Sequence, residues 1–111
     1  MTQSSSRPPA SVEDLIAAIR AGFQAYQELY ARYHPYLARL TERLISPELQ
    51  TDLGTSGVVQ EGFLKIWQSF PSFRGSTEAE LRAWMRAILR NTLTSEQRRL
   101  EAGRRDRGRR Q

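Results

Sequence analysis

The chain has 111 residues, 39% of them hydrophobic and 26% charged, so it is long enough for one globular domain with a single modest core. It contains no cysteine and one histidine, His34, which excludes disulfides and Cys/His metal sites and leaves a Ser/His/Asp triad dependent on a single imidazole. Glycine-rich phosphate loops are also absent, and no apolar run approaches the ~20 residues that span a bilayer. We therefore expect a cytoplasmic protein that is not an enzyme and has no cofactor, metal, small-molecule substrate or membrane partner.

Positive charge is concentrated toward the C-terminal end of the chain. Residues 1–73 carry 6 basic and 7 acidic side chains, whereas residues 74–111 carry 11 basic and 5 acidic ones. All but one of the basic residues are arginine, whose planar guanidinium makes paired hydrogen bonds with phosphates and stacks on bases. This distribution favours contact with a polyanion, such as a nucleic acid, at one end of the domain.

The N-terminal part predicts two helices behind a disordered lead. Residues 1–10 are rich in Ser and Pro and lack the apolar stretch of a signal peptide. Ser11 and Asp14 then form a capping pair for a helix over Val12–Arg20. A second helical pattern runs from Phe23 to about Ile45, and Pro35 is expected to kink or divide it. The apolar positions of this second helix are spaced by three or four, at Tyr26, Tyr30, Tyr33, Leu37, Leu40 and Leu44.

The middle of the chain predicts a polar loop followed by a helix with two different faces. The loop covers residues 46–57, which include a proline and two glycines, and the helix covers about Val58–Ser69. The core face of this helix is expected to contain Val59, Phe63, Ile66, Trp67 and Phe70. Its other residues are Gln60, Glu61, Leu64, Lys65 and Gln68.

The C-terminal part predicts a connector, a long helix and a basic tail. The connector covers residues 71–76, and Thr77 with Glu80 forms a capping box for a helix from about Glu78 to Glu101. The core face of this helix is expected to contain Leu81, Trp84, Met85, Ile88, Leu89 and Leu93, while Arg82, Arg86 and Arg90 recur on another face. Residues 103–111 are mostly arginine and predict a flexible tail or the start of a linker. With no strand pattern anywhere, we expect an all-α protein, a compact bundle of about four helices over residues 11–102.

Three short segments in this framework resemble region 2 of bacterial sigma factors, especially the extracytoplasmic-function group. They are Val58-Val59-Gln60-Glu61 with the following Phe63 to Trp67, Ser72-Phe73-Arg74-Gly75, and Ala83-Trp84-Met85 with Ile88 and Asn91-Thr92 behind it. Their order and spacing match the family from Leu29 to about Arg99. Gly62 is a departure, because a larger residue is usual there. The chain also ends where such a factor would continue into the domain that reads the −35 element, so this is either a fragment or a one-domain protein.

The resemblance implies that the helix over residues 58–69 binds core RNA polymerase. Its counterpart in the family docks on a coiled coil of the largest polymerase subunit. The polymerase-binding residues would be Gln60, Glu61, Leu64, Lys65 and Gln68. An exposed leucine with a polar rim is typical of such an anchor. From the spacing alone, a solvated face with one stray leucine is the alternative. An anti-sigma factor is a further partner that the resemblance leaves open.

The resemblance also implies that the connector captures a base flipped out of the non-template strand at the promoter −10 element. Phe73, Arg74, Gly75 and Ser76 would form the capturing loop, and Asn91 would read a base edge through its amide. For Phe73, packing in the core is an equal alternative. The phosphate contacts would come from Arg82, Arg86, Arg90, Arg98 and Arg99.

The sequence therefore leaves three hypotheses open. The first is a transcription-initiation module that binds core polymerase and recognises and melts the −10 element. The second is a generic basic bundle that coats nucleic acid through its arginines alone. The third is a polymerase-binding adaptor that never melts DNA.

Overall fold

The structure is a computed structural model that describes residues 11–22 and 24–109, with side chains described as far as Asp106. The predicted lead over residues 1–10 lies outside the described residues. Within the described part every regular element is helical: α2 (Val12–Arg20), α3 (Tyr26–Leu44), α4 (Pro47–Asp52), α5 (Gly54–Ser69), the short 3₁₀ turn η1 (Phe70–Ser72) and α6 (Glu78–Arg109). The predicted all-α bundle is confirmed.

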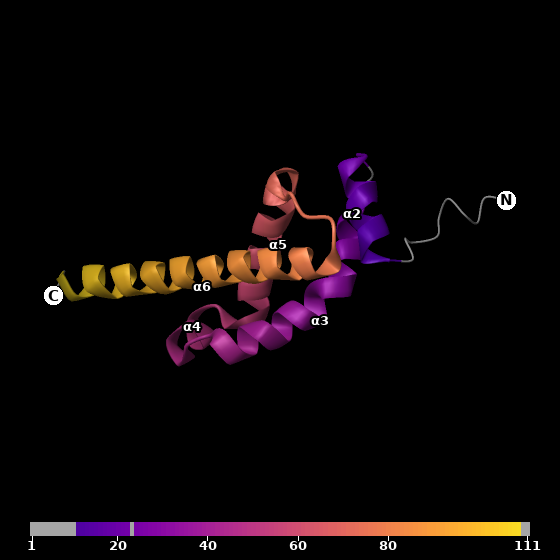
Figure 1. Cartoon of the computed structure of the whole chain (residues 1–111). Helices are drawn as coiled ribbons and strands as arrows, with labels where there is room; N and C mark the ends of the chain where they lie inside the picture. The colour runs from indigo at the N-terminus through magenta and orange to yellow at the C-terminus, as the bar shows by residue number, and fades with distance from the viewer. Residues whose placement is uncertain (1–10, 23, 110–111) are drawn as a thin grey trace.

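The long helix α6 organises the bundle. In Figure 1 it runs beside α3 and crosses α5, while α2 packs near its N-terminal end and α4 lies beside its middle. The buried apolar side chains of α2, α3, α5 and α6 form one contiguous core, which includes Leu15, Leu29, Leu37, Phe63, Ile66, Leu81, Met85 and Leu89. Burying these side chains at about 25 cal/mol per Å² is the main source of stability for a domain of this size.

Helix starts follow the capping residues that the sequence predicts. The Ser11 hydroxyl accepts a hydrogen bond from the Asp14 amide at 3.1 Å and so caps α2. At α6 the Thr77 hydroxyl accepts from the Glu80 amide at 3.2 Å, and the Glu80 carboxylate accepts from the Thr77 amide at 3.1 Å. Two otherwise unpaired amides are thus satisfied reciprocally, and the predicted capping box is confirmed.

The predicted loop over residues 46–57 is wrong, because most of it is helical. Ser46 accepts a hydrogen bond from the Leu49 amide at 3.2 Å, and Pro47 occupies the first turn of α4, where its missing donor costs nothing. Leu49 is 1% exposed and anchors α4 in the core. Gly54, with a φ of 83°, then supplies the left-handed residue that separates α4 from α5.

Two other expectations about helix continuity need correction. Pro35 does not divide the second helix, because α3 is continuous from Tyr26 to Leu44. The flexible tail predicted from residue 103 is also wrong as far as the described residues reach, since α6 continues to Arg109. Arginine is a good helix former and no proline occurs between Gly103 and Arg109, so the segment can continue the helix despite its two glycines. Leu100 also packs against the core near α4.

Gly62 lies where α5 packs against α6. It is buried, and a Cβ atom placed on it would lie 3.2 Å from the Cδ1 atom of Leu89. A larger side chain would need Leu89 to shift, so the glycine loses helix propensity here but allows close packing. This explains the departure from the family pattern that the sequence shows.

Candidate polymerase-binding and promoter-binding surfaces

The outer face of α5 presents the residues predicted to bind polymerase. Leu64 is 45% exposed, and both Gln60 and Gln68 are exposed beside it. Glu61 and Lys65 are half-buried at the edges of this face. The opposite side of the helix is buried in the core, so α5 is held rigidly while this side faces solvent. An exposed leucine inside a polar rim can serve as an apolar anchor for a partner.

An aromatic cluster on α3 adjoins this face, and the sequence did not predict it. The ring of Tyr26 lies 5.1 Å from that of Trp67, and the ring of Tyr30 lies 4.9 Å from that of Phe63 and 5.0 Å from that of His34. Tyr26 is 39% exposed, although its spacing placed it on the apolar stripe. Trp67, predicted as core, is only partly buried and packs at the edge of the core.

The connector after α5 contains one buried ring, that of Phe73, among accessible residues. Phe73 is 4% exposed, and its ring centroid lies 4.9 Å from that of Trp84 and 5.6 Å from that of Phe70. Of the two alternatives for Phe73, the structure therefore shows packing in the core. Arg74 and Ser76 are exposed and Gly75 is half-buried. We call residues 73–76 the capture loop.

Gly75 closes the capture loop onto the Phe73 ring. A Cβ atom at residue 75 would lie 2.7 Å from Cζ of Phe73 and 2.7 Å from Cβ of Glu80, too close for any side chain. The loop ends where the Ser76 amide donates a hydrogen bond to the Glu80 carboxylate at 2.7 Å. This bond, and then the bond from the Thr77 amide, lower the pKa of Glu80 because they favour the ionised carboxylate.

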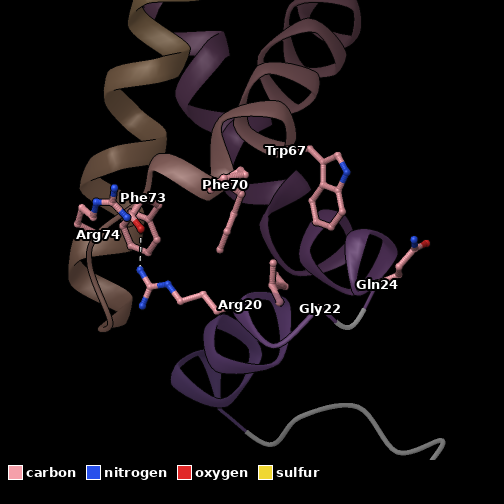
Figure 2. Close-up of a pocket in the computed structure, with 9 residues that line it drawn as sticks. Arg20, Gly22, Gln24, Trp67, Phe70, Phe73 and Arg74 are labelled. Atoms are coloured by element: carbon pink, nitrogen blue, oxygen red, sulfur yellow. Dashed lines mark hydrogen bonds between the residues drawn. The ribbon is translucent and has the colours of Figure 1, made fainter.

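Arg20 at the end of α2 holds the capture loop from the other side, and no local feature of the sequence indicates this contact. Its guanidinium donates hydrogen bonds to the backbone oxygens of Phe73 and Gly75, at 2.7 Å and 2.5 Å. The guanidinium carbon also lies 5.3 Å from the Phe73 ring centroid. Figure 2 shows Arg20 reaching across from α2 toward Phe73.

A cavity of about 620 Å³ lies beside the capture loop. Trp67 and Phe70 line one part of it, and Phe73 lines another beside Arg20 and Arg74 (Figure 2). Rings and guanidinium groups together are the side chains on which unpaired bases stack. The surroundings of the capture loop are therefore compatible with a nucleobase.

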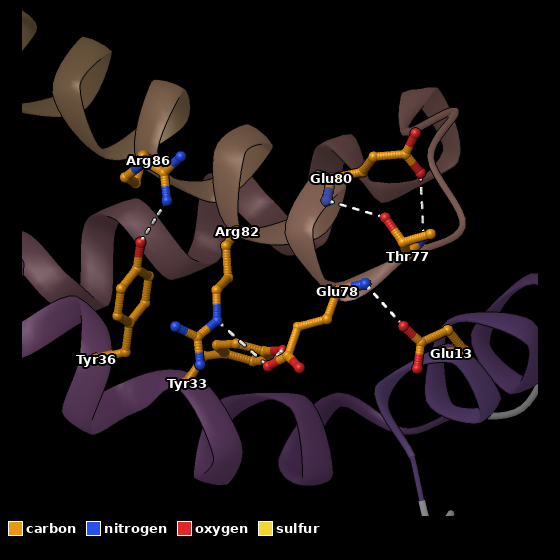
Figure 3. A network of polar contacts seen from close by, with 8 residues as sticks. All are labelled: Glu13, Tyr33, Tyr36, Thr77, Glu78, Glu80, Arg82 and Arg86. Carbon is orange, nitrogen blue, oxygen red and sulfur yellow. Dashed lines mark hydrogen bonds and ion pairs between the residues drawn. The ribbon is translucent and has the colours of Figure 1, made fainter.

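The predicted arginine row on α6 is divided between two surroundings. Arg82 lies 4.9 Å above the Tyr36 ring and pairs with Glu78 at 3.2 Å, and Arg86 donates to the Tyr36 hydroxyl at 3.0 Å. Both side chains thus contact α3 (Figure 3).

The Tyr33 hydroxyl donates to the Glu78 carboxylate at 3.1 Å. Burial, and then this neighbouring carboxylate, raise the pKa of Tyr33 to about 12.

The remaining predicted DNA contacts are exposed on α6, beyond the part that contacts Tyr36. Arg90, Asn91 and Arg98 are all exposed, and Arg90 forms no hydrogen bond or ion pair with any residue that the structure describes. Arg99 is also exposed and pairs with Glu96 at 3.3 Å. Asn91 follows Trp84 by two helical turns, which is ~10 Å along the axis, so it does not belong to the capture loop itself.

Other classes of site find no support in the described part of the chain. Among residues 11–22 and 24–109, no three or more His, Cys, Asp or Glu side chains gather as metal ligands would. None of the helices there combines the length and hydropathy that crossing a membrane requires.

Comparison with known proteins agrees with the resemblance seen in the three sequence segments. No significant match was found among curated proteins or among solved structures. The family model of sigma-70 region 2 matches residues 29–103, which is most of the chain and includes α5, the capture loop and the first part of α6. The chain therefore belongs to the sigma-70 region 2 family, whose role is RNA polymerase binding and promoter recognition.

Proposed function

We propose that this domain docks on core RNA polymerase through the outer face of α5 and captures an unpaired base of the non-template strand at the capture loop. Polymerase binding and promoter recognition follow from family membership. The assignment of each step to particular residues, and the melting of the −10 element, are the proposal. The observation that carries it is the direct succession of the two surfaces: α5 leads through η1 into the capture loop without an intervening segment.

This succession has a mechanical consequence. The exposed side of α5 and the capture loop belong to one packed body, in which Phe63 and Ile66 of α5 and Phe73 of the loop share the core. A partner bound to α5 therefore fixes the position of the loop relative to polymerase. Holding a capture site in place removes much of the ordering cost of binding, and that saving offsets the few kcal/mol of lost stacking for a flipped base.

Charge on α6 extends the capture loop into a DNA-binding surface. Arg90 and Arg98 are exposed on the side of α6 that faces solvent, and Asn91 lies between them. Arginine contacts with phosphates give affinity and register without sequence preference, while an amide such as that of Asn91 can read a base edge. Duplex DNA next to the melted segment would lie along this side of α6.

The adaptor alternative is favoured by one observation, the burial of Phe73. A ring that already packs on Trp84 and Phe70 is not free to stack on a base unless the loop opens. In the adaptor hypothesis the domain binds polymerase in the same way but makes no base-dependent contact.

Three features remain predictions of the sequence: the resemblance to the extracytoplasmic-function group, a location in the cytoplasm and an anti-sigma partner.

The polymerase-docking proposal is tested by capture of purified core RNA polymerase on immobilised protein. Leu64→Glu places a charge at the proposed anchor, and we expect capture to fall by about tenfold or more, as at an apolar hot spot. Leu44→Glu is the matched control, because Leu44 is 42% exposed and lies at the far end of α3. Equal capture by the wild type and by Leu64→Glu would contradict docking through α5.

The base-capture proposal is tested with single-stranded DNA in two salt concentrations. Fluorescent strands of about 12 nucleotides, with bases intact or replaced by abasic sites, separate base contacts from phosphate contacts. Phosphate affinity falls steeply with salt, whereas the ratio between intact and abasic strands is expected to persist. A ratio of one at both salt concentrations would favour the adaptor.

A further inference from the structure

We propose that Arg20 is a positioning residue for base capture, through which α2 sets the conformation of the capture loop. This inference rests on the proposed function and extends it to a part of the chain outside the matched family segment, which begins at residue 29. Arg20 lies 53 and 55 residues before the two residues whose carbonyl groups it binds. No residue inside the matched segment makes an equivalent contact with these carbonyls in the part of the chain that the structure describes.

The first step of the argument is the geometry of the guanidinium. Arg20 donates to the carbonyl oxygens of Phe73 and Gly75, which flank Arg74, and it lies over the Phe73 ring at 5.3 Å. One terminal nitrogen, Nη2, therefore donates to both carbonyl groups that flank Arg74, while the planar guanidinium lies over the Phe73 ring. Hydrogen bonds from a charged donor are stronger than neutral ones. An ammonium group has donors for both oxygens but no planar face to lie on the Phe73 ring.

The second step is that α2 also fixes the far side of the capture loop. The Glu13 carboxylate accepts a hydrogen bond from the Glu78 amide at 3.0 Å, at the first turn of α6 (Figure 3). Glu13 and Arg20 lie at opposite ends of the same helix, and Val12, Leu15 and Ile16 hold that helix in the core. The loop and the start of α6 are thus tied to one rigid element.

The third step concerns the groups that remain available to a ligand. Arg20 occupies two carbonyl oxygens, and Glu80 occupies the amides of Ser76 and Thr77. The exposed side chains that the loop still presents are those of Arg74 and Ser76. Because the acceptors on one side are already bound, the loop keeps a single shape and offers hydrogen-bond donors outward. A prearranged loop loses less entropy when it closes on a base.

The experiment measures base-dependent binding in three variants of the full chain. The probes are single strands of about 12 nucleotides, oligo-dT, oligo-dC, oligo-dA and a fully abasic strand. The measured quantity is the ratio of the Kd for the abasic strand to the Kd for the tightest oligonucleotide. The variants are Arg20→Ala, Arg20→Lys and the charge-matched control Arg39→Ala, whose side chain is exposed on α3.

We expect Arg20→Ala to lower the ratio by about tenfold, as for the loss of one strong charged hydrogen-bond pair. Arg39→Ala should leave the ratio unchanged while weakening every strand equally. Arg20→Lys should recover only part of the ratio, because it restores the charge and a hydrogen-bond donor but not the planar guanidinium over the Phe73 ring. Capture of core RNA polymerase should be equal in all three variants, which shows that the fold and the α5 surface are intact.

The outcomes separate this inference from the proposed function. A wild-type ratio above one that Arg20→Ala leaves unchanged overturns the role of Arg20 while base capture stands. A wild-type ratio of one overturns base capture, and the role of Arg20 with it. Full recovery by Arg20→Lys would show that charge alone suffices, which also contradicts positioning by the guanidinium.

Discussion

Substituting Gly75 by alanine should open the capture loop. The new Cβ atom would lie 2.7 Å from Cζ of Phe73, 2.9 Å from its Cε1 atom and 2.7 Å from Cβ of Glu80. None of these atoms can yield cheaply, because the ring is packed on Trp84 and the Glu80 Cβ is fixed to the helix backbone. The backbone at residue 75 must therefore move away from the ring, and the hydrogen bond that its carbonyl group accepts from Arg20 is weakened.

The expected loss of stability follows from two opposing terms. Forcing a methyl group into a packed site costs about 1–3 kcal/mol. Replacing glycine reduces the entropy of the unfolded chain and returns about 0.4–1 kcal/mol. The net loss should be about 1–2 kcal/mol, which lowers the midpoint of thermal unfolding by about 5–15 °C in a domain of this size. Circular dichroism of the helical signal during heating measures it.

Gly57→Ala is the matched control for this variant. A Cβ atom there would lie 2.8 Å from Cγ and 2.9 Å from Cδ1 of Leu53, distances as short as those at Gly75. Leu53 is 38% exposed, however, so its side chain can turn into solvent. Since alanine also favours the helix by up to ~1 kcal/mol, this variant should be at least as stable as the wild type. Equal stability of Gly75→Ala and the wild type would refute the closed loop that the structure shows.

Two further predictions concern charged and ionisable groups. The pKa of Tyr33 is raised to about 12 from an ordinary 10.0, so its protonated hydroxyl stabilises the fold fully below pH 10. This contribution is lost as the pH rises from 10 through 12. Urea unfolding at these pH values should show that Tyr33→Phe loses less free energy of unfolding than the wild type. Arg90→Ala should reduce the salt slope of DNA binding by about 1, whereas Arg82→Ala should reduce it less, because Arg82 is already paired with Glu78. Equal slopes for the two variants would contradict this division of the arginine row.

The sequence predicted those parts of the fold that depend on local chemistry. The starts of α2 and α6 follow from Ser11 and from Thr77 with Glu80, because a cap acts within one turn. Helix α4 was missed because its signals, Ser46 and Pro47, also read as a helix end, and only the burial of Leu49 in the tertiary structure makes the segment helical. The spacing of apolar residues within a segment does not show which other helix that segment packs against.

The same distinction applies to the candidate site. The exposure of Leu64 could be predicted, since it lies off the apolar stripe of α5. The contact between Arg20 and the capture loop could not, because it joins residues more than 50 positions apart and an arginine in the last turn of a helix has an ordinary local explanation. Equal spacing of Arg82, Arg86 and Arg90 likewise concealed that Tyr36 of α3 binds the first two.

The division of the arginine row constrains the path of DNA over the domain. At 100° per residue, Arg82 projects about 160° away from Trp84, on which the capture loop packs, so Arg82 and the loop lie on different sides of α6. Asn91 projects within about 20° of Trp84, two turns further along. A strand held at the capture loop therefore continues toward Asn91 and then the exposed Arg98, which projects about 40° from Trp84, and not toward Arg82. Arg82 and Arg86 bind Tyr36 and so connect α3 to α6. The side of α6 that carries Asn91 is left facing outward.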